Sequence, residues 1–180
     1  MLHKIKYSNS TLKFYHKDTL VHYGICKVSW FKQRKILSDP SKNEILRIKT
    51  KIGFNGIRHI INFKNDLTDI ILKLKGSLSK NYYECIYKKD EYRIICHRGH
   101  NTSIFKNGEQ IAYYSKKSSA VFSAPEIQLI SNSDINFHLI FSFILSLEIS
   151  YQDKNEAITL DLGNVGGEFK PFNEKWTPRN

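Results

Sequence analysis

The feature that most constrains the fold of this chain is a long succession of short segments in which apolar and polar residues alternate. The alternation is strict over 44–52 and over 69–75, where β-branched side chains fall on one face. A period of two residues is that of a half-buried β-strand. We therefore predict strands at 4–7, 11–16, 19–31, 44–52, 57–63, 69–75, 82–87, 91–97, 102–106, 110–115, 119–123, 127–131 and 158–162.

The connections between these segments are short. Asn107 and Gly108 lie between two alternating arms, and both tolerate the positive φ angles that a type I′ hairpin turn requires. We expect another turn at 88–90. Strands joined in this way favour an antiparallel meander or a barrel over alternating strand–helix–strand units.

One segment differs from the rest. Residues 135–149 include ten large apolar side chains, and His138, Ser142 and Ser146 form a narrow polar stripe with a spacing of four. A spacing of two also fits the segment, but its length and the capping residues at 132–134 favour a buried helix. Such a helix would be roughly 22 Å long, against about 30 Å for a bilayer core. We therefore predict a core helix rather than a membrane span.

A hairpin at 104–112, followed by an acidic residue and an apolar helix from Asp134 to Glu148, resembles the tubby C-terminal-like superfamily. That superfamily includes LURP-one-related proteins and phospholipid scramblases. The resemblance extends over roughly residues 10–150 in pattern. It implies a mainly β fold, a closed antiparallel barrel of about twelve strands around one central hydrophobic helix at about 134–150. It does not imply scrambling, because the chain lacks the cysteine cluster that scramblases use for palmitoylation.

A physical argument supports this architecture. A barrel of many strands has a lumen wider than its own side chains fill, and a helix that is apolar on nearly all sides needs cover on all sides. We therefore expect one barrel domain at 1–150 and an irregular extension at 151–180, rich in glycine and proline, packed on the barrel.

The charge is unevenly distributed. Residues 1–100 hold 21 Lys and Arg against 8 Asp and Glu, whereas residues 101–180 hold 7 against 9. A basic half-chain is typical of proteins that bind anionic membranes or nucleic acid. Biased composition is the competing explanation, because 22 of the 28 basic residues are Lys and only 6 are Arg. Specific phosphate or base recognition favours Arg.

The most distinctive candidate for a binding surface is the segment 27–35, in which two aromatic residues lie among four cations. Such a mixture suits a membrane interface, where rings lie at headgroup level and cations attract anionic lipid. It also suits single-stranded nucleic acid. The alternative is an ordinary strand end followed by a basic loop. The candidate anion- or lipid-binding residues are Lys27, Trp30, Phe31, Lys32, Arg34 and Lys35.

Other motifs carry little chemistry. Cys96, His97 and His100 lie close in sequence, but zinc sites need four ligands, and a strand end followed by a turn explains them more simply. No phosphate-binding loop or nucleophile motif is present. The sequence therefore predicts no metal site, no cofactor and no catalytic residues.

Two classes of function stay open. The first is a non-catalytic binding module, peripheral on anionic membrane or bound to another protein. The second is an enzyme or carrier with a small-molecule pocket at the barrel mouth, and nucleic-acid binding through the basic half is a further alternative. Three scattered cysteines and the lack of an apolar N-terminal signal segment favour the cytoplasm, including a peripheral position at the membrane.

Overall fold

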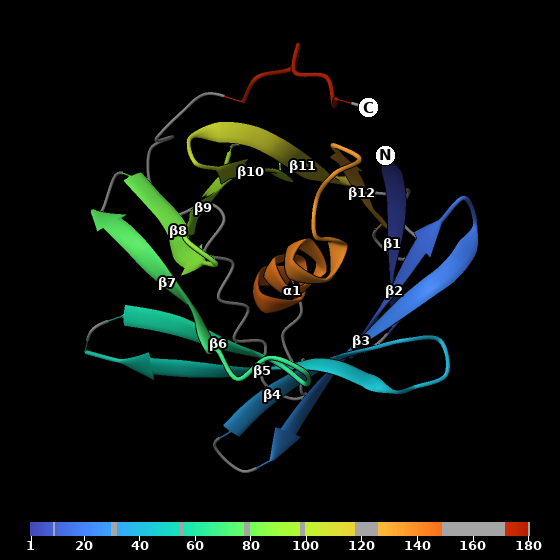
Figure 1. Cartoon of the computed structure of the whole chain (residues 1–180), viewed down its shortest axis with the longest axis vertical. Coiled ribbons are helices and arrows are strands. Elements are labelled where there is room, and N and C mark those ends of the chain that lie inside the picture. Colours follow the sequence, from blue (N-terminus) through green and yellow to red (C-terminus); the bar gives the residue numbers. More distant parts are fainter. Residues whose placement is uncertain are drawn as a thin grey trace.

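The computed structural model describes residues 1–8, 10–29, 32–54, 56–77, 80–97, 100–117, 126–148 and 172–179. Twelve strands close into an antiparallel barrel, and a helix runs through its lumen (Figure 1). This confirms the predicted fold class. The elements are β1 (Leu2–Ser8), β2 (Thr11–His16), β3 (Thr19–Ser29), β4 (Lys32–Ser38), β5 (Glu44–Gly53), β6 (Gly56–Phe63), β7 (Ile70–Ser77), β8 (Lys80–Tyr87), β9 (Asp90–Cys96), β10 (Asn101–Lys106), β11 (Glu109–Lys117), β12 (Glu126–Ser131) and α1 (Phe137–Glu148).

Each strand pairs with the next along the chain, and β1 pairs with β12 to close the barrel, with Leu2 opposite Ile130. Closure leaves no edge strand with unpaired backbone groups. We call the end of the barrel at which α1 begins the first mouth. There Phe137 packs on His3 at the start of β1. We call the opposite end the second mouth.

The predicted hairpin turns are confirmed. Asn107 and Gly108 have φ angles of 50° and 83°, and Lys88 and Lys89 have φ angles of 50° and 72°. The Asn107 side chain also connects its turn to the β8–β9 turn, because its amide nitrogen donates to Asp90 Oδ1 at 2.7 Å. Two successive residues with positive φ, as in a type I′ turn, therefore set the register of each hairpin.

The helix is shorter at its start than the predicted range. Asn136 caps it, since the side-chain oxygen of Asn136 accepts a hydrogen bond from the Leu139 backbone nitrogen at 3.1 Å, and the expected caps at 132–134 precede it. Residues 139–146 are all buried. The two serines there donate to helix carbonyl oxygens, Ser142 to Leu139 and Ser146 to Ser142, each at 2.7 Å. The two serines of the polar stripe are thereby satisfied within the helix.

The core forms where inward side chains of the strands meet the helix. The rings of Phe14 and Phe141 lie 4.5 Å apart between centroids, and Leu46, Ile94 and Ile144 are fully buried in the same cluster. Gly24 faces the helix so closely that an added Cβ would lie 2.7 Å from Leu145 Cδ1. A side chain at this position would therefore collide with the helix.

One strand was not predicted. The sequence indicates a single strand over 19–31 and then a basic loop, whereas the structure has β3 ending at Ser29 and β4 beginning at Lys32. The basic residues hid the pattern, because one of the cations in β4 points into the barrel where an apolar residue would be expected. Predicted strands 119–123 and 158–162 lie outside the described residues.

The end of the chain lies against the barrel. Phe172 packs on His97 with 5.5 Å between ring centroids, and Trp176 packs on Tyr113 with 5.8 Å. The Arg179 backbone nitrogen donates to Asn132 Oδ1 at 2.8 Å. Most of the predicted extension, residues 151–171, lies outside the described residues.

Candidate anion-binding face

Two of the predicted site residues lie side by side on the outer surface. Lys27 on β3 is directly opposite Arg34 on β4, and both side chains are exposed. Their alkyl stems share one face of the sheet because residues opposite one another in an antiparallel pair point the same way. Lys27 and Arg34 are therefore the first two members of a candidate binding face.

Lys35 does not belong to that face, so its assignment to the binding surface was wrong. Its side chain is only 3% exposed, and Nζ donates to the carbonyl oxygen of Ser146 at 2.5 Å. Successive side chains of a strand point to opposite sides, so Arg34 and Lys35 cannot both face outward. Burial lowers the pKa of Lys35 to about 8.

The other three predicted residues lie wholly or partly outside the described part of the chain. Trp30 and Phe31 lie outside the described residues, and the structure describes the backbone of Lys32 in β4 but not its side chain. Their part in binding therefore stays a prediction.

The register of the barrel adds further cations to the Lys27–Arg34 pair. Arg34 is opposite Lys49 on β5, and in the next row Lys51 on β5 is opposite Arg58 on β6, which is opposite Lys73 on β7. All of these positions face outward in the half of the barrel nearer the second mouth. We call this set the basic face: Lys27, Arg34, Lys49, Lys51, Arg58, Lys73 and Lys75.

The positive charge of this face is not cancelled locally. None of its seven cations forms an ion pair with an acidic residue of the described ranges. The described carboxylate closest in register, Glu84 opposite Lys73, already pairs with Arg93. Among the described residues, the face therefore carries a dense positive charge without an acidic partner.

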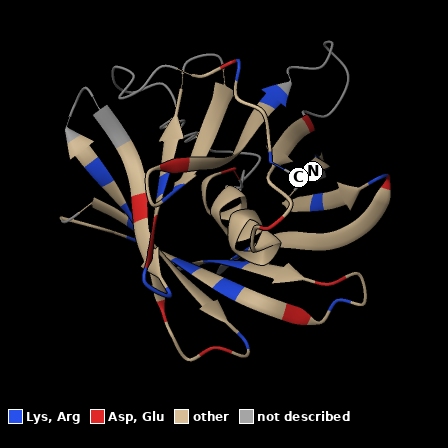
Figure 2. Ribbon diagram, turned by 45° about the horizontal axis from the view of Figure 1, so that its top comes forward, with Lys and Arg blue, Asp and Glu red and all other residues tan. Residues whose placement is uncertain are grey.

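Acidic residues gather at the other end of the barrel. Much of the acidic colouring in Figure 2 lies in turns and at strand ends, whereas the basic colouring also runs along neighbouring strands. The strand order places these turns at the first mouth. The acidic residues there are Asp18, Asp39, Glu44, Asp66, Asp69, Asp90, Glu91, Glu109 and Asp134.

A shallow hollow of about 560 Å³ opens on the outer surface of β5 and β6, and Lys49 and Lys51 form part of its wall. Both carboxylates in its lining have partners, because Glu44 pairs with Arg47 at 3.0 Å and Asp69 accepts a hydrogen bond from Asn62. The hollow therefore offers its unpaired lysines to an anionic group.

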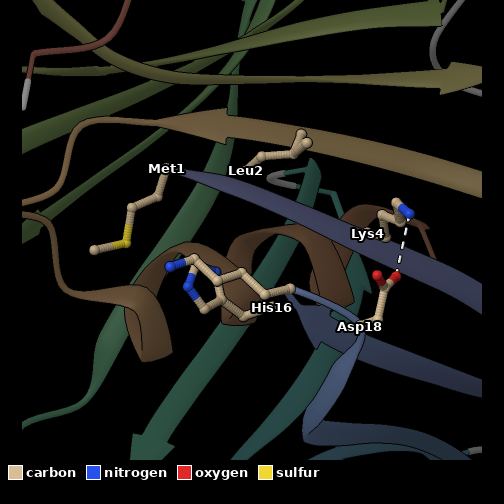
Figure 3. Close-up of a pocket in the computed structure, with 6 residues that line it drawn as sticks. Met1, Leu2, Lys4, His16 and Asp18 are labelled. Atoms are coloured by element: carbon tan, nitrogen blue, oxygen red, sulfur yellow. Dashed lines mark hydrogen bonds and ion pairs between the residues drawn. The ribbon is translucent and has the colours of Figure 1, made fainter.

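A second hollow, of about 350 Å³, lies at the first mouth between β1 and the β2–β3 turn (Figure 3). Met1 and Leu2 supply apolar surface, and His16 lies opposite them. Lys4 and Asp18 point toward each other, with Nζ and Oδ1 3.2 Å apart. This ion pair engages the one carboxylate of the lining and leaves Lys17 and His16 as its other polar groups, so the hollow does not present a converging set of reactive groups.

Histidines surround the start of α1. His22 and His138 approach to 3.1 Å between their Nε2 atoms, and the rings of His3 and His16 lie 4.7 Å apart. Burial, reinforced by neighbouring imidazoles, lowers the pKa of His3 and of His22 to about 4. Neutral imidazoles can bind metals, but the described part of the chain holds no group of three or more ligands placed around one ion.

A buried polar cluster lies at the end of α1. The Glu148 carboxylate accepts hydrogen bonds from the hydroxyls of Tyr7 at 3.2 Å and Tyr114 at 2.8 Å, and it pairs with Lys116 at 2.6 Å. Burial raises the pKa of both phenols. These contacts hold the end of the helix to two strands, β1 and β11, which is a structural role.

The motif around Cys96 is also structural. His97 is buried, and its Nε2 lies 3.0 Å from the hydroxyl of Ser103 on the neighbouring strand. His100 is exposed and has a φ angle of 62°. The two histidines therefore face different surroundings and do not converge on one ligand.

Sequence reasoning missed the cations of β5, β6 and β7 as site residues. The alternation in 44–52 and 69–75 does show that Lys49, Lys51 and Lys73 share the polar side of their strands. It does not show which strands are neighbours or in what register they pair. Strand order and register decide whether these lysines lie next to one another and form a face.

Within the described ranges, no helix has both the length and the apolar character that a membrane span needs. No protein-family model, no curated protein and no solved structure matches this chain, so its resemblance to the tubby C-terminal-like superfamily stays a prediction.

Proposed function

We propose that this chain is a non-catalytic binding module that docks peripherally on an anionic membrane surface through its basic face. The observation that carries the proposal is the set of adjacent rows Lys27–Arg34–Lys49 and Lys51–Arg58–Lys73, in which no cation has an acidic partner among the described residues. The resemblance to the tubby-like superfamily fits it, since such domains are mostly binders and are known for contact with phosphoinositides. The corresponding location is the cytoplasm, at the membrane surface.

The distribution of charge supports an oriented encounter. Each Lys or Arg close to an anionic bilayer contributes about 1 kcal/mol of attraction. Acidic residues at the first mouth are repelled by the same surface, so the barrel approaches with the second mouth and the basic face leading. If the net positive charge alone caused binding, neither end of the barrel would be preferred at the membrane.

The test compares two triple variants of equal net charge by co-sedimentation with phosphatidylcholine vesicles that contain or lack phosphatidylserine. We expect the variant with Lys49, Lys51 and Lys73 replaced by Gln to lose on the order of 100-fold in affinity for anionic vesicles. The control replaces Lys17, Lys42 and Lys89, which are exposed in turns at the first mouth, and should bind nearly as the wild type does.

Salt dependence and competition complete the test. Binding should weaken steeply with added salt, since the Debye length at physiological ionic strength is about 8 Å. Equal losses in the two triple variants would overturn the assignment of the face and leave a non-specific effect of net charge. If the protein binds a single-stranded oligonucleotide but not anionic vesicles, its partner is nucleic acid and the membrane proposal is wrong.

A further inference from the structure

The hairpin that joins β5 and β6 carries two large apolar side chains in water. Phe54 is fully exposed and Ile52 is 74% exposed. The hairpin end is also open among the described residues, where an added Cβ at Gly53 or Gly56 would meet no atom within 4 Å. The hairpin end therefore projects from the barrel at the second mouth.

Cations lie directly behind this apolar end. Lys51 precedes Ile52 in β5 and is opposite Arg58 in β6, and Lys49 and Lys73 lie next to them on the same outer surface. A strand rises about 3.3 Å per residue, so Phe54 and Lys51 are separated by roughly 10 Å along the hairpin. Interfacial helices bury their apolar face to a comparable depth of about 5–10 Å at the boundary between headgroups and acyl chains.

The apolar character of Ile52 and Phe54 favours a membrane over other polyanions as the partner. Nucleic acid is held by phosphate contacts together with aromatic platforms on which bases stack, and an isoleucine offers no such platform. Single exposed apolar residues are common on soluble proteins and need no explanation. Here two of them share one projecting end, with a belt of unpaired cations behind them, which is the order of groups in a membrane interface.

We propose that the β5–β6 hairpin inserts Ile52 and Phe54 into the acyl region of an anionic bilayer while Lys49, Lys51, Arg58 and Lys73 contact the lipid phosphates. This inference rests on the proposed membrane docking and adds the element that enters the membrane. It makes binding depend on two separable contributions, an electrostatic one that salt screens and an apolar one that salt does not screen.

The test uses the double variant Ile52→Ser with Phe54→Ser. We expect its affinity for vesicles of phosphatidylcholine and phosphatidylserine to fall about 10-fold or more, because the transfer of apolar surface from water is lost. Its affinity for heparin, a soluble polyanion without an acyl region, should stay at the wild-type value. The matched control is Leu67→Ser with Ile86→Ser, which removes two exposed apolar side chains elsewhere and should leave both affinities unchanged.

A fluorescence measurement reports insertion directly. In a background with Trp30→Phe and Trp176→Phe, a Phe54→Trp substitution provides a single indole at the hairpin end. We expect its emission to shift to the blue on anionic vesicles and to be quenched by brominated acyl chains. The same reporter at Leu67 should show neither effect.

The outcomes separate this inference from the docking proposal. If the Lys49, Lys51 and Lys73 variant loses vesicle binding but the serine double variant binds like the wild type, insertion is wrong and docking stands. Equal losses of vesicle and heparin affinity in the serine variant would also overturn insertion, since the hairpin would then act without an acyl phase. If the wild type binds no anionic vesicles, both proposals fall.

Discussion

The ammonium group of Lys35 on β4 donates a hydrogen bond to the carbonyl oxygen of Ser146 in the last turn of α1, with 2.5 Å between the two atoms. Carbonyl oxygens in the last turn of a helix have no partner within the helix, and a positive charge there interacts favourably with the helix dipole. The same contact removes a cation from the predicted binding surface and fastens the end of the helix to the barrel wall.

Shortening this side chain should therefore destabilise the fold without affecting binding. We expect Lys35→Ala to lower the free energy of unfolding by about 2 to 4 kcal/mol, because it leaves a cavity and an unpaired carbonyl oxygen. Lys35→Met keeps most of the volume and should cost about 1 kcal/mol. Urea unfolding measures both, and vesicle affinity of the Met variant should equal that of the wild type.

The pH dependence of the free energy of unfolding, compared between the wild type and Lys35→Met, gives an independent check. The folded pKa of Lys35 is about 8, below its ordinary value of 10.5, so between these pH values the unfolded chain binds more protons than the folded one. Wild-type stability should therefore rise relative to Lys35→Met as the pH increases from 8 to 10. A constant difference across that range would show that Lys35 keeps an ordinary pKa in the folded protein.

Gly24 permits the close approach of β3 to the helix, and enlarging it should be costly. A Cβ at this position would lie 2.7 Å from Leu145 Cδ1 and 3.3 Å from Phe14 Cε2, inside a fully packed core. We expect Gly24→Ala to lower the free energy of unfolding by about 1 to 3 kcal/mol. The control Gly53→Ala, where an added Cβ meets nothing within 4 Å, should change it by less than about 0.5 kcal/mol.

A double variant identifies the residue responsible. Leu145→Val removes the terminal carbon that the new methyl group would meet, so in combination with Gly24→Ala the two costs should partly cancel. We expect a coupling of at least about 0.5 kcal/mol in thermal or urea unfolding. Strictly additive effects would mean that the strand moves away from the helix as a whole.

Buried neutral histidines should make the protein sensitive to mild acid. The pKa values of His3 and His22 are about 4 and that of His59 is about 3, against an ordinary value of 6.5, and burial is the main cause for each. Between pH 6.5 and 4 the unfolded chain binds more protons, so stability falls as the pH is lowered. Each such histidine contributes up to about 1.4 kcal/mol per pH unit.

His3→Phe tests the contribution of one of these histidines to the acid sensitivity. The His3 ring packs on His16 and on Phe137, and its Nδ1 has no hydrogen-bond partner among the described residues, so a phenyl ring fits the surroundings. The variant should lose less stability than the wild type between pH 6.5 and 4.5 in urea unfolding. An unchanged slope, matching that of the exposed-site control His100→Gln, would exclude His3 as a source of acid sensitivity.

Local sequence carried much of the architecture. The alternation around Leu46 and Leu72, the Asn107–Gly108 turn and the apolar run through Phe141 each indicate their element because spacing along the chain decides which side chains share a face. The patterns alone left a meander or a barrel open; the closed barrel was implied by the resemblance to the tubby-like superfamily, with support from the argument that the helix needs cover and the lumen needs filling. The start of the helix was misplaced because several neighbouring residues can cap it, and only packing selects Asn136.

The candidate site depended on information of another kind. Arg34 and Lys35 are adjacent cations in sequence, yet one faces water and the other faces the helix, and the missing apolar residue hid β4 from pattern analysis. Which cations meet across strands depends on strand neighbours and register. Strand neighbours and register are set when the whole chain closes into a barrel around α1. The sequence by itself determined the strands other than β4, the hairpin turns and the core helix, because these depend on near neighbours. Only the tertiary structure brought Lys27, Arg34 and Lys49 into one row and left Ile52 and Phe54 beyond its end, because long-range packing decides which surfaces stay in water.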